Sequence, residues 1–130
     1  MIFFPEPKLR KQWESGNLDP RLESMVMICE ALWSRDMPPR AVVVTSIQRP
    51  KTTDSGVHAD WRGVDIRTRD IPNSMVDEAA QKINRTFVYG GGFNAALVHD
   101  VGYGIHLHLQ VPPPRIAADE FVGYNLRGHE

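Results

Sequence analysis

Apolar and polar side chains alternate along residues 105–111, which read Ile-His-Leu-His-Leu-Gln-Val. Side chains of a strand point alternately to its two faces, so this pattern predicts a strand with one apolar and one polar face. The apolar face must pack on a core. The other face then presents His106, His108 and Gln110 together. The chain is therefore constrained to form a sheet with one packed face and two neighbouring imidazoles on the other.

A second polar string precedes this strand, at residues 55–65, and contains His58 and Asp65. They lie seven residues apart, across a loop that enters a short predicted strand, and such a turn can bring both side chains to one point. Two histidines and a carboxylate are the usual protein ligands of a catalytic zinc that keeps one position open for water. The alternative is that His58 and Asp65 are unrelated surface residues and that the two strand histidines lie on a solvated face. The conjunction of both strings favours a bound divalent metal.

The remaining periodic segments predict the elements around these strings. Asp19-Pro20 is a helix start, with Asp as N-cap and Pro at the first helical position, and an apolar stripe follows as far as Trp33. Asn73 is predicted to cap a second helix, whose stripe ends at Phe87. Strands are predicted at 41–47, 63–67, 95–99 and 105–111, with a hairpin connection over 100–104.

This order of elements predicts an α+β domain with a mostly antiparallel sheet and two main helices. With 130 residues, we expect one domain with its core at about 19–111. The polar, proline-broken segment up to Leu18 is predicted to be an arm or loop. Pro112-Pro113-Pro114 ends the sheet, because proline cannot donate to a ladder, and an irregular tail follows.

Composition excludes several classes of function. The formal net charge of -1 gives no global electrostatic case for binding nucleic acid or an anionic membrane. Cys29 is the only cysteine, which excludes an intramolecular disulfide and a cysteine-based zinc site. The apolar start, residues 1–4, is far too short for a signal peptide or a spanning segment, so we expect no membrane insertion and synthesis in a cytoplasm.

With these motifs, the chain resembles the zinc peptidases grouped with lysostaphin, the D-alanyl-D-alanine metallopeptidases and the hedgehog signalling domain. Their shared signature is His, six residues, Asp, and a later His-x-His or acid-x-x-His on a strand. His58, Asp65 and the pair His106 and His108 match it. In addition, the string at 46–50, Ser-Ile-Gln-Arg-Pro, is similar to the Ser-x-x-Arg-Pro string that precedes the first ligand in the D-Ala-D-Ala branch. The resemblance covers roughly residues 41–111.

The resemblance implies a small hedgehog/D-Ala-D-Ala-peptidase-like fold and a Zn²⁺ ion bound by His58, Asp65 and His108. It implies that His106 stands beside the bound water as the acid/base group, and that Arg49 lies over the substrate and helps polarise the carbonyl. No acid stands three residues before either later histidine. Catalysis would therefore depend on His106, unless folding brings Asp60 or Asp100 near.

The function implied is that of a zinc metallopeptidase that cuts stem peptides or crosslinks of bacterial peptidoglycan. The chain's size and lack of a signal suit a phage lysis or virion-associated protein, whose partners could include other virion proteins or further copies of itself. The alternative is a zinc-stabilised structural or binding module of a phage particle with little or no catalysis. A third reading is a zinc amidase of another fold with the same ligands.

Two features of the sequence bear on the choice between an enzyme and a structural module. An enzyme needs Arg49 pointing into the zinc cleft and a groove for a peptide, whose expected walls are the loop 51–57 and the glycine run 90–92. Trp61 stands where the resembling peptidases commonly have glycine. Turned inward, its ring would fill the space that a stem peptide needs. Turned outward, it is a core or rim aromatic.

Overall fold

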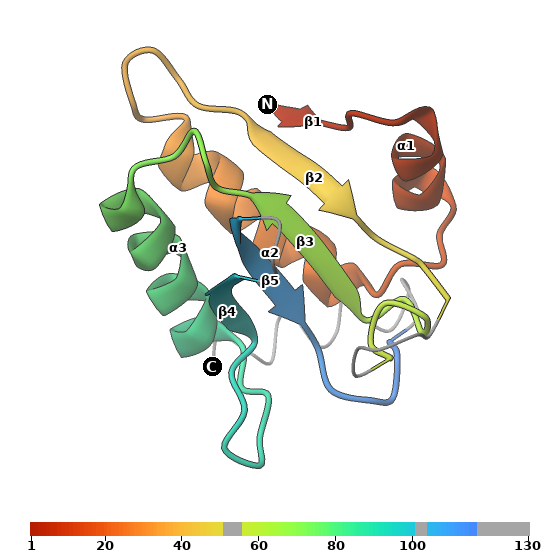
Figure 1. Ribbon diagram of the computed structural model, residues 1–130. Coiled ribbons are helices and arrows are strands. Elements are labelled where there is room, and N and C mark those ends of the chain that lie inside the picture. Colours follow the sequence, from red (N-terminus) through yellow and green to blue (C-terminus); the bar gives the residue numbers. More distant parts are fainter. Residues whose placement is uncertain (51–55, 101–103, 117–130) are drawn as a thin grey trace.

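The computed structural model describes residues 1–50, 56–100 and 104–116, and these form an α+β fold. In this part of the chain the strands form one five-stranded mixed sheet in the order β1-β2-β3-β5-β4 (Figure 1). They are β1 (Ile2–Phe3), β2 (Val42–Ser46), β3 (Gly63–Arg67), β4 (Ala96–Asp100) and β5 (Ile105–Gln110). β1 is parallel to β2, and the other neighbouring pairs are antiparallel. The predicted α+β class is confirmed.

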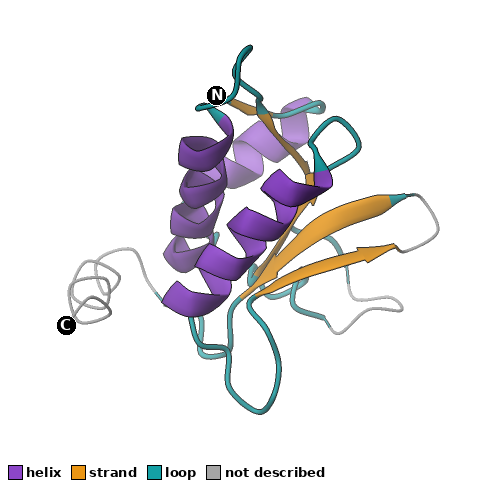
Figure 2. Cartoon of the chain, turned by 90° about the vertical axis from the view of Figure 1, so that its left-hand side faces the viewer, coloured by secondary structure: helices purple, strands orange, loops and turns teal. Residues whose placement is uncertain are grey.

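The described residues contain three helices: α1 (Pro7–Glu14), α2 (Pro20–Trp33) and α3 (Asn73–Thr86). Figure 2 shows α2 and α3 side by side on one face of the sheet, with the core between the two layers. The indole nitrogen of Trp33 donates to the carbonyl of Met75 at 3.1 Å and joins the two helices. None of these helices is long and apolar enough to cross a membrane.

The predicted N-cap is correct for α2 but not for α3. Asp19 caps α2 as predicted, since its Oδ1 accepts from the backbone N–H of Arg21 at 3.0 Å and Pro20 is the first helical residue. The cap predicted at Asn73 is wrong: the N-cap of α3 is Pro72. The carbonyl of Pro72 accepts the N–H of Met75 at 2.9 Å, so the backbone closes the first turn without a side-chain cap.

The segment before α2 is not the irregular arm that its polarity suggested. β1 extends the sheet beside β2, and α1 packs on the core through Leu9, which is buried. The rings of Phe4 and Trp13 lie 5.6 Å apart and hold α1 against the end of β1. A two-residue strand and an eight-residue helix are too short to show a clear periodicity in sequence.

The register of β3 and β5 separates a packed face from a polar face. Asp65 lies opposite His108, and Arg67 lies opposite His106. The intervening side chains are fully buried against the helices; they are Val64, Ile66, Leu107 and Leu109. The alternation predicted for residues 105–111 is therefore confirmed for Leu107, Leu109 and Val111, whereas Ile105 at the start of the strand is exposed rather than packed. The face turned away from α2 and α3 carries the histidines.

The proline run after β5 is tied to the start of α2 rather than loose. The guanidinium of Arg21 donates to the carbonyls of Pro112 and Pro114 at 2.8 and 3.0 Å. The chain is described as far as Ile116. The rest of the expected tail, the middle of the 100–104 connection and most of the 51–57 loop lie outside the described residues.

Candidate metal centre

A tight turn at residues 56–62 places His58 under the polar face of the sheet. The N–H of Arg62 donates to the carbonyl of Val57 at 2.8 Å, and the N–H of Trp61 donates to that of His58 at 3.2 Å. Trp61 takes a left-handed φ of 59°, uncommon for a bulky residue, to close the turn. Gly63 follows where a Cβ atom would lie 2.8 Å from Val57 Cγ2, so only glycine lets the turn approach β3 so closely.

The hydrogen bond made by one ring nitrogen of His58 shows which of the two nitrogens carries the hydrogen. Nδ1 lies 2.8 Å from the carbonyl oxygen of Ile47, which can only accept, so Nδ1 carries the hydrogen. Nε2 then presents a lone pair, and it is buried without a hydrogen-bond partner among the residues that the structure describes. It faces Asp65 Oδ2 at 3.3 Å. A buried acceptor left in this way costs roughly 1–3 kcal/mol, which a cation at this point would offset.

A hydrogen bond with Gln110 orients His108 in a similar way. The amide nitrogen of Gln110 donates to the carbonyl of Asn94 at 2.9 Å, which turns Oε1 towards His108. Nε2 of His108 donates to this oxygen at 3.1 Å. The remaining nitrogen, Nδ1, lies 2.8 Å from Asp65 Oδ1. Each histidine therefore turns its free nitrogen towards a different oxygen of one carboxylate.

These donors converge on one small volume. One ligand atom each of His58, Asp65 and His108 lies within 4.8 Å of the others, and all three residues are buried. Neutral imidazole lone pairs facing a carboxylate repel it, so a proton or a metal ion must lie between them. Two nitrogens and an oxygen, with the outer ring nitrogens held by Ile47 and Gln110, are the donors and orienting contacts that zinc takes in proteins. The residues present fit a divalent metal.

The ionisation of Asp65 agrees with this arrangement. Burial by itself raises the pKa of the carboxyl. With protons on the nitrogens of His108 and His58 that face it, their hydrogen bonds and positive charge outweigh burial and lower the pKa well below its ordinary value of 3.8. Asp65 is therefore an anion at neutral pH. A buried anion needs a positive partner, which a metal ion would supply.

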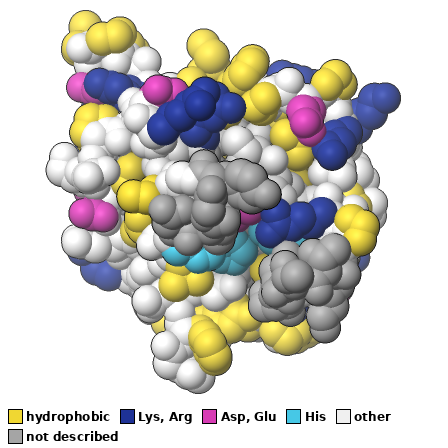
Figure 3. Space-filling model, in the orientation of Figure 1, with side chains coloured by type: hydrophobic (Ala, Val, Ile, Leu, Met, Phe, Trp, Pro, Cys, Tyr) yellow, Lys and Arg dark blue, Asp and Glu magenta, His cyan; other side chains and the backbone are white. Residues whose placement is uncertain are grey.

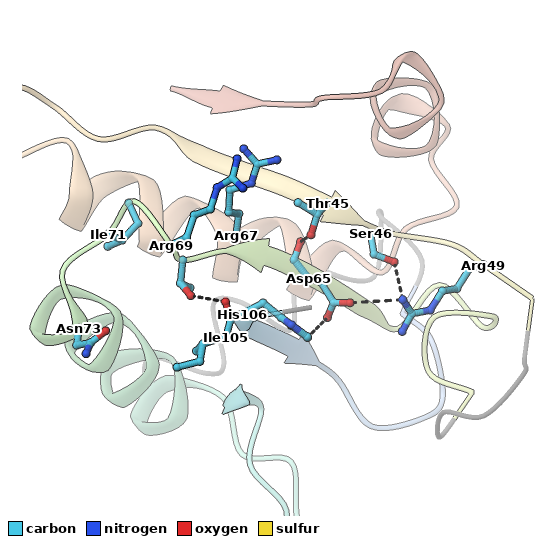
Figure 4. Close-up of a pocket in the computed structure, with 12 residues that line it drawn as sticks. Thr45, Ser46, Arg49, Asp65, Arg67, Arg69, Ile71, Asn73, Ile105 and His106 are labelled. Carbon is cyan, nitrogen blue, oxygen red and sulfur yellow. Dashed lines mark hydrogen bonds and ion pairs between the residues drawn. The ribbon is translucent and has the colours of Figure 1, made fainter. Parts of the chain in front are cut away.

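The two predicted catalytic side chains lie at the open edge of this centre (Figure 4). His106 Nε2 is 3.7 Å from Asp65 Oδ1, and its side chain is 15% exposed. Arg49 Nη1 is 3.7 Å from Asp65 Oδ2 and 3.3 Å from Ser46 Oγ. The fold thus brings all five residues singled out in the sequence together. The roles of His106 and Arg49 in catalysis stay predictions.

A further histidine, His99, also contacts this group, and the sequence had not indicated it. It lies opposite His106 in the β4–β5 ladder, and its ring is 4.6 Å from that of His106 and 5.5 Å from that of His108. Burial and the two neighbouring imidazoles lower its pKa. The pairing of His99 with His106 could have been predicted only from the register of the β4–β5 hairpin, and this register depends on the length of the connection between the two strands. The orienting roles of Ile47 and Gln110 were also missed.

A groove with a volume of about 580 Å³ opens beside Asp65 and His106. In Figure 3, histidine side chains reach the surface at the centre of this face, with basic side chains next to them. The described lining residues are Thr45, Ser46, Arg49, Asp65, Arg67, Thr68, Arg69, Ile71, Asn73, Gly104, Ile105 and His106.

The structure tests part of what the sequence predicted for the surroundings of this groove. The glycine run 90–92 does not line it, because those residues form a separate turn beyond α3; that expected wall is wrong. Residues 51–55 of the other expected wall lie outside the described residues. Trp61 packs against the core and is not part of the lining, so its ring leaves the groove open. Asp60 pairs with Arg62 at 2.6 Å and takes no part in the centre.

Comparison with protein-family models, with curated proteins and with solved structures finds no match to this chain.

Proposed function

We propose that this protein is a zinc-dependent peptidase that cleaves peptide bonds in the stem peptides or crosslinks of bacterial peptidoglycan. We also propose that its α+β fold is of the hedgehog/D-Ala-D-Ala-peptidase-like kind. The phage context suggested by the sequence, as a lysis or virion-associated protein, belongs to the same proposal. Its support is the motif resemblance together with the geometry of the site.

The observation that carries the proposal is the convergence of two imidazole lone pairs on one carboxylate beside an open groove. His58 Nε2 and His108 Nδ1 face the two oxygens of Asp65 at 3.3 and 2.8 Å. His106 and Arg49 stand at the side from which a peptide in the groove would approach. A purely structural metal needs neither of these two side chains nor a groove.

The chain's own residues can perform the proposed reaction. When bound, zinc would supply Lewis acidity to the scissile carbonyl and lower the pKa of water. His106 Nε2 is positioned to take a proton from the attacking water and return it to the leaving amine. Arg49 keeps its charge at any working pH, and its guanidinium can stabilise negative charge on the carbonyl oxygen.

Digestion of purified peptidoglycan, with products resolved by mass, tests the proposal. We expect new peptide termini with the zinc-loaded protein, none after chelation, and recovery when zinc is restored. Arg49→Lys keeps the charge but loses the planar fork, so turnover should fall while zinc content stays unchanged. Absence of new termini with a zinc-loaded, folded protein would reject the peptidase.

One observation favours the second candidate, a zinc-stabilised structural or binding module. His58 is fully buried, and Asp65 and His108 are only 6% and 8% exposed, so a metal here would be largely enclosed. In that case zinc should raise the unfolding temperature, and the wild-type protein should show little or no peptide turnover. The variants Arg49→Lys and His106→Ala should then have the same metal content and the same low turnover as the wild type. The groove lined by His106 and Arg49 is the reason to prefer the enzyme.

A further inference from the structure

The groove beside the metal centre is basic, although the chain as a whole is not. Three of its described lining residues are arginines: Arg49, Arg67 and Arg69. The formal net charge of the protein is -1, so this grouping is local. Among the lining residues that the structure describes, the only acid is Asp65, which faces the histidines of the candidate metal centre.

Two of these arginines lie on the side of Asp65 away from Arg49 (Figure 4). Arg67 is on β3 two residues after Asp65, so both side chains belong to the same face of the sheet and their Cα atoms are separated by about 7 Å. The side chain of Arg67 is half-buried, and its guanidinium makes no hydrogen bond or ion pair with any residue that the structure describes. A half-buried guanidinium without an anionic partner is suited to binding a negatively charged ligand.

The second arginine is only weakly engaged. Arg69 Nε is 3.8 Å from Asp70 Oδ2, and these side chains are 72% and 74% exposed. An exposed pair at this distance is worth little, so Arg69 stays available to a ligand in the groove. Thr68 lies between the two arginines and fixes the strand end, because its hydroxyl donates to the carbonyl of Ile105 at 2.7 Å.

We propose that Arg67 and Arg69 form a carboxylate-binding subsite, and that the substrate is an acidic peptide with its carboxylate one or two residues from the cleaved bond. This rests on the proposed peptidase function and adds the substrate's charge to it. An extended peptide advances about 3.3 Å per residue, so about two residues span the distance between the Cα atoms of Asp65 and Arg67. Guanidinium groups bind carboxylates through paired, charge-assisted hydrogen bonds.

The test uses one stem peptide with a free α-carboxylate on its D-glutamate and the same peptide with this group amidated. Amidation removes the charge and hardly changes the size. KM for the acidic peptide should be at least about tenfold lower than KM for the amidated peptide. This difference in KM should become smaller at high salt, because salt screens the charges. In the Arg67→Ala/Arg69→Ala variant, KM for the acidic form should rise to the value of the amidated form, with zinc content unchanged. Arg85→Ala, an exposed arginine of α3 outside the groove, is the control and should change neither value.

Both peptides are also prepared with an amidated C-terminus, which separates the α-carboxylate of the D-glutamate from the carboxylate at the C-terminus. A preference that follows only the C-terminus would overturn the assignment to a carboxylate within the peptide. Cleavage without any charge preference would overturn the subsite while leaving the peptidase intact.

Calorimetric titration of the zinc-loaded protein with the same peptides provides a readout apart from turnover. Binding of the acidic form that is lost in the double arginine variant supports the subsite even if no bond is cut, and then the peptidase alone fails. Equal binding of both forms by the wild-type protein would overturn the subsite.

Discussion

His106 and His108 stand on the same face of β5, but their surroundings differ. His108 is enclosed, with Gln110 on one ring nitrogen and Asp65 on the other, whereas His106 reaches the groove. We expect His108→Ala to lose the metal, because a ligand nitrogen is removed. His106→Ala should keep the metal but lower turnover by about 100-fold or more. Metal analysis and peptide turnover on both purified variants check this difference.

The opposite pattern would reverse the assignment within the pair. If His106→Ala is metal-free while His108→Ala retains one zinc per chain, His106 is the ligand. Circular dichroism of both variants is the control, because loss of metal has to be separated from loss of fold.

Gln110 would act on a bound metal through His108. Its Oε1 holds the Nε2–H of His108 at 3.1 Å, which leaves Nδ1 free for a metal. Gln110→Ala should lower zinc affinity by about 10–100-fold, the usual effect of removing a contact that orients a ligand. Competition with a chelating dye measures it. Gln81→Ala, on the exposed face of α3, is the matched control, and equal affinities for the two variants would contradict the role.

At the scale of single residues, the sequence predicted the candidate metal ligands and the candidate acid/base residue but not the residues that orient them. His58, Asp65 and the His106/His108 pair are visible because few other functions need that set at that spacing. Ile47 contributes only its backbone carbonyl, so its side chain gives no signal. Gln110 looked like one more polar residue on a strand face, because its role depends on Asn94 across the sheet.

From outside the motif region, the helix α1 holds the segment that carries Arg49. The amide nitrogen of Gln12 donates to the carbonyl of Gln48, and the N–H of Gln48 donates to Gln12 Oε1, both at 3.2 Å. Gln48 lies between Ile47, which orients His58, and Arg49. Gln12→Ala should therefore lower kcat about tenfold through misplacement of Arg49. Removing the two hydrogen bonds should lower the free energy of unfolding by about 1–3 kcal/mol.

A role of Gln12 in stability alone would lower the unfolding temperature and leave kcat unchanged, so both are measured along with zinc affinity, which should stay the same. Lys11→Ala, one residue away on an exposed position of α1, should change none of them. A normal kcat in the Gln12 variant at a temperature where it is fully folded would contradict the positioning role.

At the scale of elements, long periodic segments were predictable and short ones were not. α2, α3 and the β3–β5 pair follow from their apolar patterns. β1 and α1 depend on tertiary contacts such as that of Phe4 with Trp13, and the paired contact of Gln12 with Gln48 joins positions 36 residues apart. No local pattern encodes such a contact.

In the molecule as a whole, a buried ion pair links the start of α2 to the end of the sheet. The guanidinium of Arg21 donates to both oxygens of Asp19 at 3.0 and 2.8 Å, and it also binds the proline run after β5. Asp19 is fully buried. Arg21→Met should lower the free energy of unfolding by about 3–5 kcal/mol, because it leaves an uncompensated buried carboxylate. Urea denaturation measures this loss.

The double variant Asp19→Asn/Arg21→Met removes both charges and keeps a capping oxygen, so it should recover part of the lost stability. Arg35→Ala, at an exposed position just after α2, should stay within about 0.5 kcal/mol of the wild type. A similarly small effect of Arg21→Met would show that the pair does not hold the two ends of the fold together.

We propose that His58, Asp65 and His108 together bind one zinc ion. Native mass spectrometry of demetallated protein after addition of one equivalent of zinc tests it most directly. The comparison is with Asp65→Asn, which keeps the shape of the side chain and removes its charge, and circular dichroism verifies the fold of both. One zinc per wild-type chain and little or none on the folded Asp65→Asn variant is the expected result. No zinc on the wild-type chain, or equal zinc on both, would contradict the claim.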